Sequence, residues 1–265
     1  MSRETELRNK WVLITGASSG FGAAAALAFA AKGARLLLGA RRKERLEAVA
    51  TEARSAGAPA AHVFALDVSQ TSSVEAFFAA VRRQTERLDV LINNAGGAHG
   101  LDPVAQGKDE DWEATVQTNV LGILRVTRAA LPLMLNNPGS TIINIGSLAG
   151  RVAYEGGSAY CAAKAGELQI SRTLRLELNG TGIRVSSVDP GLAETEFSLV
   201  RFKGDTARAK KVYEGTNPLV GEDIADILVW VACRPPHVNI DEMLIKPVDQ
   251  AAIHKVFRRP AKSQS

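Results

Sequence analysis

Tyr160 and Lys164 lie four residues apart in the segment Ser158-Ala-Tyr-Cys-Ala-Ala-Lys-Ala165. On a helix this spacing puts both side chains on one face, with their Cβ atoms about 5–6 Å apart. An ammonium held beside a phenol favours the phenolate and lowers the pKa of the phenol from its reference of about 10. The pair therefore predicts a tyrosine that serves as an acid or base near neutral pH. The spacing alone also fits an aromatic ring packed under the aliphatic stem of a lysine.

A glycine-rich turn follows the first apolar segment. Thr15-Gly-Ala-Ser-Ser-Gly-Phe-Gly22 comes directly after Trp11-Val-Leu-Ile14 and precedes an alanine-rich helical pattern. Glycines at a strand-to-helix turn let a diphosphate approach the backbone, and the helix N-terminus offers it free N–H groups. The spacing is Gly-x3-Gly-x-Gly instead of Gly-x-Gly-x-x-Gly. Its place at the first strand–helix junction nevertheless predicts a dinucleotide site.

The second apolar segment ends in a cluster of cations, Arg41-Arg42-Lys43. An NAD-binding domain usually offers Asp or Glu at this place, where the acid binds the ribose hydroxyls. Arginine instead binds a 2′-phosphate through charge-assisted hydrogen bonds, and that phosphate would repel a carboxylate. Positive charge at a helix start opposes the helix dipole, which favours a binding role for these side chains. We therefore expect NADP(H) as the cofactor.

Short apolar segments alternate with amphipathic segments along the whole chain. This alternation predicts an α/β fold with a single doubly wound parallel sheet of the Rossmann type, with about seven strands and helices on both faces. The expected strands are 11–14, 35–40, 62–66, 90–93, 141–145, 184–188 and 243–247. The expected helices are 20–32, 43–56, 71–87, 109–136, 158–179 and 221–233.

The chain reads as one catalytic domain over residues 1–265, because no repeat or linker divides it. The charged and glycine-rich region 191–220 breaks the strand–helix rhythm, as substrate lids often do. A polar tail is expected from about residue 258, next to the basic stretch Lys255–Arg259. A solvated terminus accounts for that stretch, and no recognised binding motif accompanies it, so we expect no nucleic-acid partner.

Composition points to a cytoplasmic protein without a membrane span. The net charge is +4, and no segment approaches the roughly 20 apolar residues that a membrane helix needs. No signal-like apolar segment is found at the N-terminus. The two cysteines, Cys161 and Cys233, lie far apart, which is typical of a reducing compartment, and they lack metal-ligand spacing. We expect no metal.

Taken together, the motifs resemble the short-chain dehydrogenase/reductase family over nearly the whole chain. The matching motifs are Thr15–Gly22, Asp67-Val68, Asn93-Asn-Ala-Gly96, Asn119, Ser147, Tyr160-x3-Lys164 and Pro190-Gly191 through Thr195. A dinucleotide-sensing regulator that had lost the chemistry should lack Ser147, Tyr160 or Lys164, and all three are present. The resemblance therefore implies an oxidoreductase.

The resemblance also implies roles for individual residues. Tyr160 would be the acid in carbonyl reduction and the base in alcohol oxidation, and Ser147 would bind the substrate oxygen. Lys164 would lower the pKa of the tyrosine and bind the nicotinamide ribose, while Asn119 would place a water in the proton relay behind Lys164. Further contacts to the cofactor are implied for Gly16, Ser18, Ser19, Gly20, Phe21, Gly22, Arg41, Arg42, Asp67, Val68, Asn94, Pro190, Gly191 and Thr195.

Two departures from the family pattern lie close to these positions. Phe21 replaces an aliphatic residue between the last two glycines, and Gly97 follows the Asn-Asn-Ala-Gly motif. Neither removes a catalytic group.

Three segments resemble one group within this family, the NADP-dependent 3-hydroxy acid dehydrogenases, also described as serine or L-allo-threonine dehydrogenases. They are Pro190–Asp205, Ser147–Tyr154 and Lys246–Gln250. That resemblance implies small 3-hydroxy acid substrates and a homotetramer. A substrate carboxylate needs a cation, for which Arg201, Lys203 and Arg151 are candidates, with Tyr154 and Ser147 as further substrate contacts. A broad carbonyl or aldehyde reductase stays open, whereas the lid sequence disfavours a 3-oxoacyl carrier-protein reductase.

Overall fold

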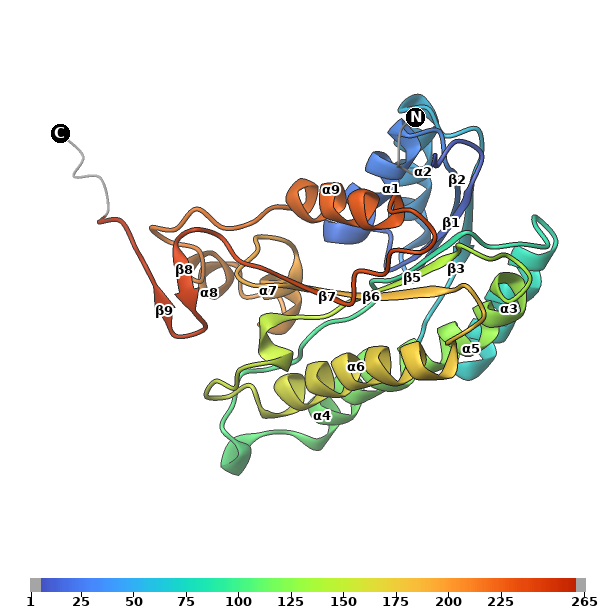
Figure 1. Cartoon of the computed structure of the whole chain (residues 1–265). Helices are drawn as coiled ribbons and strands as arrows, with labels where there is room; N and C mark the ends of the chain where they lie inside the picture. Colours follow the sequence, from blue (N-terminus) through green and yellow to red (C-terminus); the bar gives the residue numbers. More distant parts are fainter. Residues whose placement is uncertain (1–5, 261–265) are drawn as a thin grey trace.

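The computed structural model describes residues 6–260 and contains a seven-stranded parallel sheet in the order β3-β2-β1-β4-β5-β6-β7 (Figure 1). The strands are β1 (Trp11–Thr15), β2 (Arg35–Ala40), β3 (Ala61–Ala65), β4 (Val90–Asn93), β5 (Thr141–Ile145), β6 (Arg184–Pro190) and β7 (Glu242–Ile245). Every neighbouring pair runs parallel. The predicted sheet is confirmed.

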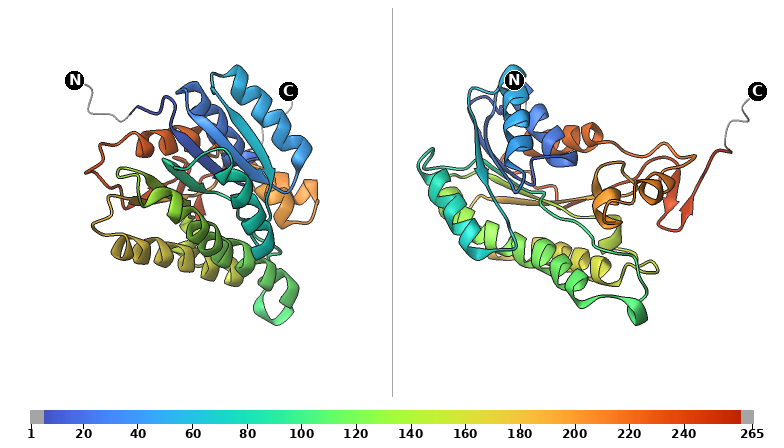
Figure 2. Two further views of the ribbon diagram at one scale, coloured as in Figure 1. Left: turned by 90° about the vertical axis from the view of Figure 1, so that its right-hand side faces the viewer. Right: turned by 180° about the vertical axis from the view of Figure 1, so that it is seen from behind.

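Helices cover both faces of the sheet (Figures 1 and 2). One face carries α1 (Gly20–Ala31), α2 (Lys43–Ser55) and α9 (Gly221–Ala232); the other carries α3 (Thr71–Arg82), α4 (Asp109–Val116), α5 (Gly122–Met134) and α6 (Ser158–Glu177). In the part of the chain that the structure describes, no helix is long and apolar enough to cross a membrane.

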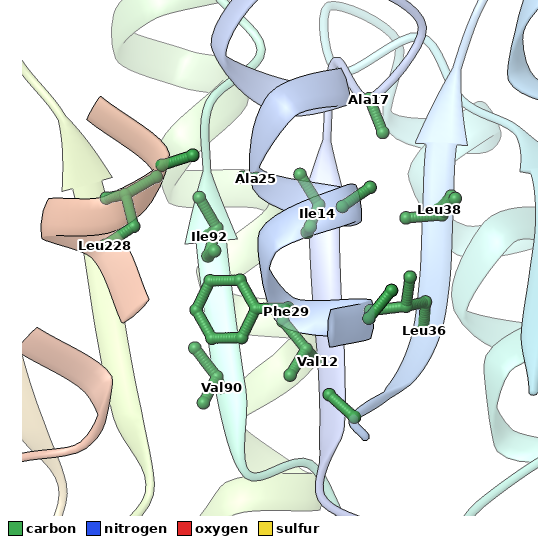
Figure 3. Packing of buried hydrophobic residues seen from close by; sticks show 14 of the residues in the cluster. Val12, Ile14, Ala17, Ala25, Phe29, Leu36, Leu38, Val90, Ile92 and Leu228 are labelled. Carbon is green, nitrogen blue, oxygen red and sulfur yellow. The ribbon is translucent and has the colours of Figure 1, made fainter. Parts of the chain in front are cut away.

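Strand β1 shows why the strands are apolar throughout. Val12 and Ile14 pack with Phe29 of α1 in one core cluster (Figure 3). Leu13 points to the opposite face and packs in a second cluster with Phe77 of α3. Successive side chains of a strand face opposite sides, so a sheet covered on both faces buries every residue of its central strands.

The strand order reverses between β1 and β4, because the chain first builds β1-β2-β3 outward and then returns to the other side of β1. Ligands of open α/β sheets bind at the carboxyl ends of the strands beside such a reversal. This edge carries the glycine turn after β1 and the Asn93–Gly96 segment after β4.

The structure adds three features to the predicted elements. A π-helical turn, η2 (Gln117–Leu121), divides the single helix predicted over 109–136. The predicted lid contains the short helices α7 (Phe197–Arg201) and α8 (Thr206–Lys211). A hairpin of β8 (Gln250–Ala252) and β9 (Lys255–Val256) precedes the predicted tail.

The start of that tail is attached to the lid region. Arg258 donates hydrogen bonds to the carbonyls of Val212 and Glu214, and Arg259 pairs with Asp249 at 2.7 Å. Residues 261–265 of the predicted tail lie outside the described residues.

Candidate active site

Tyr160 and Lys164 lie in the first two turns of α6. The Lys164 Nζ is 5.9 Å from the centre of the Tyr160 ring, so the predicted shared face is present. The same Nζ donates hydrogen bonds to the carbonyl of Ile145 at 2.7 Å and to Glu167 Oε2 at 2.6 Å. Only 6% of Lys164 is exposed, which separates it from a lysine that merely covers a ring at the surface.

The buried ammonium is stabilised by negative charge around it. Burial disfavours the charged form, but the charges of Glu167 and Tyr160 outweigh burial and raise the pKa of Lys164. Lys164 is therefore protonated at neutral pH and supplies a positive charge beside the Tyr160 ring.

Ser147 follows the end of β5 and begins the short helix η3 (Leu148–Gly150). Its Oγ accepts a hydrogen bond of 3.1 Å from the Ala149 N–H, which leaves its own O–H as a donor. A side chain at Gly150 would lie 2.6 Å from the Lys164 carbonyl. This close approach of η3 to α6 brings the end of β5 against the helix that carries Tyr160.

Asn119 lies fully buried in the π-helical turn η2. Its amide nitrogen donates to the carbonyls of Thr115, at 2.7 Å, and Gly97, at 2.8 Å. π-turns inside α-helices are frequent at functional sites, because they free backbone groups for other partners. A Cβ at Gly96 would lie 2.8 Å from Asn119 Oδ1 and 3.5 Å from Lys164 Nζ. The loop after β4 thus places Gly96 against both Asn119 and Lys164.

The glycine turn has the shape of a diphosphate cradle. Gly16 and Gly20 have φ angles of +67° and +53°, a region that favours glycine. A Cβ at Gly22 would lie 2.5 Å from the Asn94 amide, which donates a hydrogen bond of 2.8 Å to the Thr15 carbonyl. No side chain caps the N-terminus of α1, so its N–H groups are available to an anion.

Arg42 lies next to this turn. Its guanidinium donates to Ser19 Oγ at 2.7 Å and, at 3.4 Å, to Ser18 Oγ. Arg42, one of the two arginines predicted to bind a 2′-phosphate, therefore meets the serines of the glycine turn, and these residues fit NADP. Sequence reasoning missed Arg45 and Glu196, which form an ion pair with each other beside Arg42.

The other predicted cofactor contacts line the same edge of the sheet. Asp67 and Val68 follow β3, and Asp67 Oδ1 accepts hydrogen bonds from the backbone and side chain of Ser69. Pro190 ends β6, and Gly191 faces Gln250 so closely that a Cβ would lie 2.2 Å from its Oε1. Two predicted residues lie around the start of α1: Thr195 close to Gly20, and Phe21 against the core. Arg41 is exposed at the end of β2.

A cleft opens beside Tyr160. Its lining includes His99, Gly100, Asp102, Asp111, Trp112, Ala159, Tyr160 and Arg201. The Arg201 guanidinium lies 5.8 Å from the centre of the Tyr160 ring and donates to Tyr154 Oη at 2.8 Å. Burial outweighs the charge of Arg201 and raises the pKa of Tyr154 to about 12, so Tyr154 stays a neutral phenol that keeps its own proton to donate.

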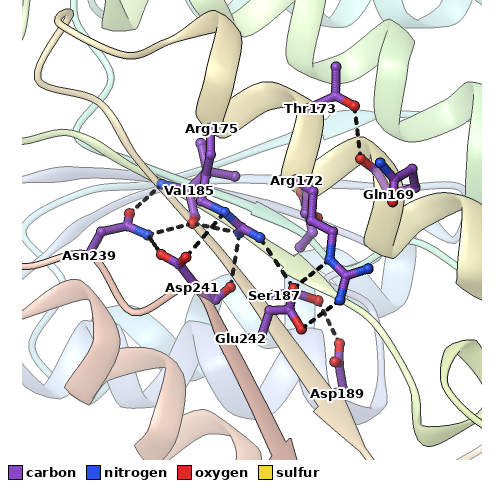
Figure 4. A network of polar contacts seen from close by, with 12 residues as sticks. Gln169, Arg172, Thr173, Arg175, Val185, Ser187, Asp189, Asn239, Asp241 and Glu242 are labelled. Carbon is purple, nitrogen blue, oxygen red and sulfur yellow. Dashed lines mark hydrogen bonds and ion pairs between the residues drawn. The ribbon is translucent and has the colours of Figure 1, made fainter.

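The other two candidate cations are paired with carboxylates, whereas Arg201 donates to two uncharged groups, the Tyr154 hydroxyl and the Gly100 carbonyl. Arg151 pairs with Asp189 and with Glu242. Figure 4 shows the second partner of the Glu242 carboxylate, Arg172, which donates to it at 2.7 Å. Lys203 pairs with Asp111 at 2.8 Å. Arg201 is therefore the candidate best placed for a substrate anion. Within residues 6–260 no cluster of side chains has the composition of a metal site.

Fold and site together define a dinucleotide-dependent oxidoreductase of the short-chain type. The sequence profile described as short chain dehydrogenase matches residues 10–204, and the chain belongs to this family.

The chain is 45% identical over 241 residues to a sulfoacetaldehyde reductase from Chromohalobacter salexigens, with 91% of this chain and 94% of the relative covered. It is 44% identical, with 91% and 96% covered, to an NADP-dependent 3-hydroxy acid dehydrogenase from Salmonella typhi. The closed form of a serine dehydrogenase complexed with NADP+ superposes with a TM-score of 0.87 at 39% identity, with 94% of this chain and 100% of that chain covered.

Proposed function

We propose that this protein is an NADP-dependent dehydrogenase that interconverts a small 3-hydroxy acid, or a close analogue, and its 3-oxo form. The observation that carries the proposal is the position of Arg201, whose guanidinium lies in the same cleft as Tyr160 and 5.8 Å from its ring. A short substrate could then place its reacting oxygen at Tyr160 and its anionic group at Arg201.

The cofactor is NADP(H). Arg42 and the serines of the glycine turn supply charge-assisted hydrogen bonds of the kind that a 2′-phosphate accepts. One relative is an NADP-dependent 3-hydroxy acid dehydrogenase, and one structural neighbour is a serine dehydrogenase complexed with NADP+. When bound, this cofactor supplies or accepts the hydride.

The protein's own residues move the proton and orient the substrate. Tyr160 Oη gives a proton to the carbonyl oxygen in reduction and takes one from the hydroxyl in oxidation. Ser147 Oγ donates a hydrogen bond to the same oxygen as negative charge develops there. Lys164 keeps its charge beside Tyr160, and Asn119 places a water in the relay behind Lys164.

Two observations support this substrate class: the position of Arg201, and a chemical feature shared by the compounds after which the relatives are named. A 3-hydroxy acid, serine and sulfoacetaldehyde all carry an acidic group on the carbon next to the reacting carbon. Arginine binds carboxylate and sulfonate oxygens with its planar set of donors. The neutral Tyr154 hydroxyl, which accepts a bond from Arg201, adds a further donor for such a group.

A turnover screen tests this function. NADP+ is supplied with L-serine, L-allo-threonine, 3-hydroxypropionate, 3-hydroxyisobutyrate and simple secondary alcohols, and NADPH with sulfoacetaldehyde and neutral aldehydes. We expect the anionic compounds to have the highest kcat/KM. Turnover of neutral alcohols and aldehydes alone would support the second candidate, a broad carbonyl or aldehyde reductase.

We also propose that the protein is a cytoplasmic homotetramer, as its family resemblance implies. Light scattering coupled to size exclusion measures the subunit number directly.

A further inference from the structure

Glu167 is a buried carboxylate that lies outside the family motifs. It lies one helical turn after Lys164 on α6 and is 0% exposed. Its Oε2 accepts the 2.6 Å hydrogen bond from Lys164 Nζ, and among the described residues its Oε1 has no hydrogen-bond partner. A buried acid is costly unless it is paired, so this position calls for a specific role.

Charged groups from two elements face this carboxylate. Lys164 approaches it from α6, and Asp189 from β6 adds negative charge nearby. Asp189 is itself held by Ser187 and Arg151. Burial and Asp189 outweigh the attraction of Lys164 and raise the pKa of Glu167 to about 7. The carboxyl therefore changes its charge near neutral pH.

Glu167 also fixes the position of the ammonium. Of the three N–H donors of Lys164, one is used by the Ile145 carbonyl and one by Glu167. The two acceptors come from β5 and from α6, so they hold Nζ at the junction of sheet and helix. One donor is left for the groups of the active site.

We propose that Glu167 is a positioning residue of the reaction, which acts through Lys164. It holds the ammonium against Ile145, and its charge sets how strongly that ammonium favours the phenolate of Tyr160. With Glu167 ionised, the positive charge beside Tyr160 is partly offset; with Glu167 protonated or replaced by glutamine, it acts undiminished. The inference rests on the proposed acid and base role of Tyr160.

A tyrosinate absorbance titration tests this inference without any substrate. The chain has only three tyrosines. Burial raises the pKa of Tyr154 to about 12 and also raises that of Tyr213, so both of these phenols ionise late in an alkaline titration. The first tyrosinate transition is assigned to Tyr160 by experiment, through its loss in a Tyr160→Phe variant.

In Glu167→Gln we expect the first tyrosinate transition at a pH about one unit lower than in the wild type, the order of shift that a nearby charge causes. Glutamine keeps the size and an acceptor for Lys164 but removes the charge. Glu167→Asp keeps the charge, so its first tyrosinate transition should lie close to the wild-type pH. Glu177→Gln, at the exposed end of the same helix, should leave it unchanged.

A first transition at the same or a higher pH in a folded Glu167→Gln protein would overturn the proposal. Kinetics provide the second readout: the alkaline rise of kcat/KM for oxidation should move in the same direction as the absorbance transition, with the affinity for NADPH kept within about twofold. An absorbance shift without a matching kinetic shift would contradict the role of Tyr160, while the link between Glu167 and Tyr160 would stand. The two claims therefore fail separately.

Discussion

The guanidinium of Arg42 donates a hydrogen bond of 2.8 Å to the carboxylate of Glu196, although the two residues lie 154 positions apart in the chain. Arg42 comes from the junction of β2 and α2, and Glu196 precedes α7 in the predicted lid. The other carboxylate oxygen pairs with Arg45. The predicted lid segment thus places an acid on Arg42, which is expected to bind the 2′-phosphate of NADP(H).

Replacing Glu196 by glutamine should tighten NADPH binding by about two- to fivefold, because exposed ion pairs contribute up to about 1 kcal/mol. The affinity for NADH, which has no 2′-phosphate, should not change. Fluorescence titration measures both constants, with Glu194→Gln as a control that alters the net charge equally at an exposed neighbouring position. Weaker NADPH binding would mean that Glu196 orients Arg42 for the phosphate and does not compete with it.

Arg42→Ala should lower the affinity for NADPH by about 10- to 100-fold, since a hydrogen bond to a charged group contributes about 1.5–3 kcal/mol. NADH binding should change little. Arg83→Ala, which removes an exposed cation at the end of α3, is the matched control. Equal losses for the two cofactors would refute the assignment of Arg42 to the 2′-phosphate.

Arg201→Ala should weaken kcat/KM for 3-hydroxy acids and sulfoacetaldehyde by about 10-fold or more, and that for neutral alcohols much less. The reason is that the guanidinium would bind only substrates with an anionic group. Arg201→Lys keeps the charge and loses the planar set of donors, so its kcat/KM for anionic substrates should lie between those of the wild type and Arg201→Ala. Equal losses for anionic and neutral substrates would assign Arg201 to shaping the cleft, through its bonds to Tyr154 and Gly100.

The buried Glu167 should make stability depend on pH. Its pKa rises from 4.5 to about 7 on folding, so the folded protein holds this proton more tightly than the unfolded chain. The stabilisation is complete below pH 4.5 and is lost as the pH rises through 7. Glu167→Gln has no carboxyl to ionise and so does not lose this stabilisation. Its free energy of unfolding should therefore increase relative to that of the wild type as the pH rises from 4.5 through 7.

Denaturant unfolding at several pH values measures this difference, with Glu177→Gln as the exposed control. A constant difference between Glu167→Gln and the wild type across the interval would show that Glu167 does not titrate there.

The sheet, its helices and the main motifs could be predicted from sequence because they depend on local patterns. Apolar runs define strands buried on both faces, and Tyr160 and Lys164 lie on one helix at a spacing that fixes their relation. The glycine turn is similarly local, since its backbone needs the positive φ angles found at Gly16 and Gly20.

Other parts of the site depend on contacts between distant segments, so the sequence pattern could not reveal them. The pairing of Glu196 with Arg42 and Arg45 requires the segment before α7 to lie against the start of α2. The π-turn at Asn119 lies in a segment that has an ordinary helical pattern. Glu167 had one available signal, a carboxylate one turn after Lys164, but its complete burial became evident only from packing.

Replacing Tyr160 by phenylalanine tests the central claim most directly. The account predicts that Tyr160→Phe binds NADPH with wild-type affinity and loses turnover by about 10²- to 10⁴-fold, the contribution typical of a general acid or base. Wild-type turnover by a folded Tyr160→Phe protein would contradict the account, because no phenol would then be needed to move the proton.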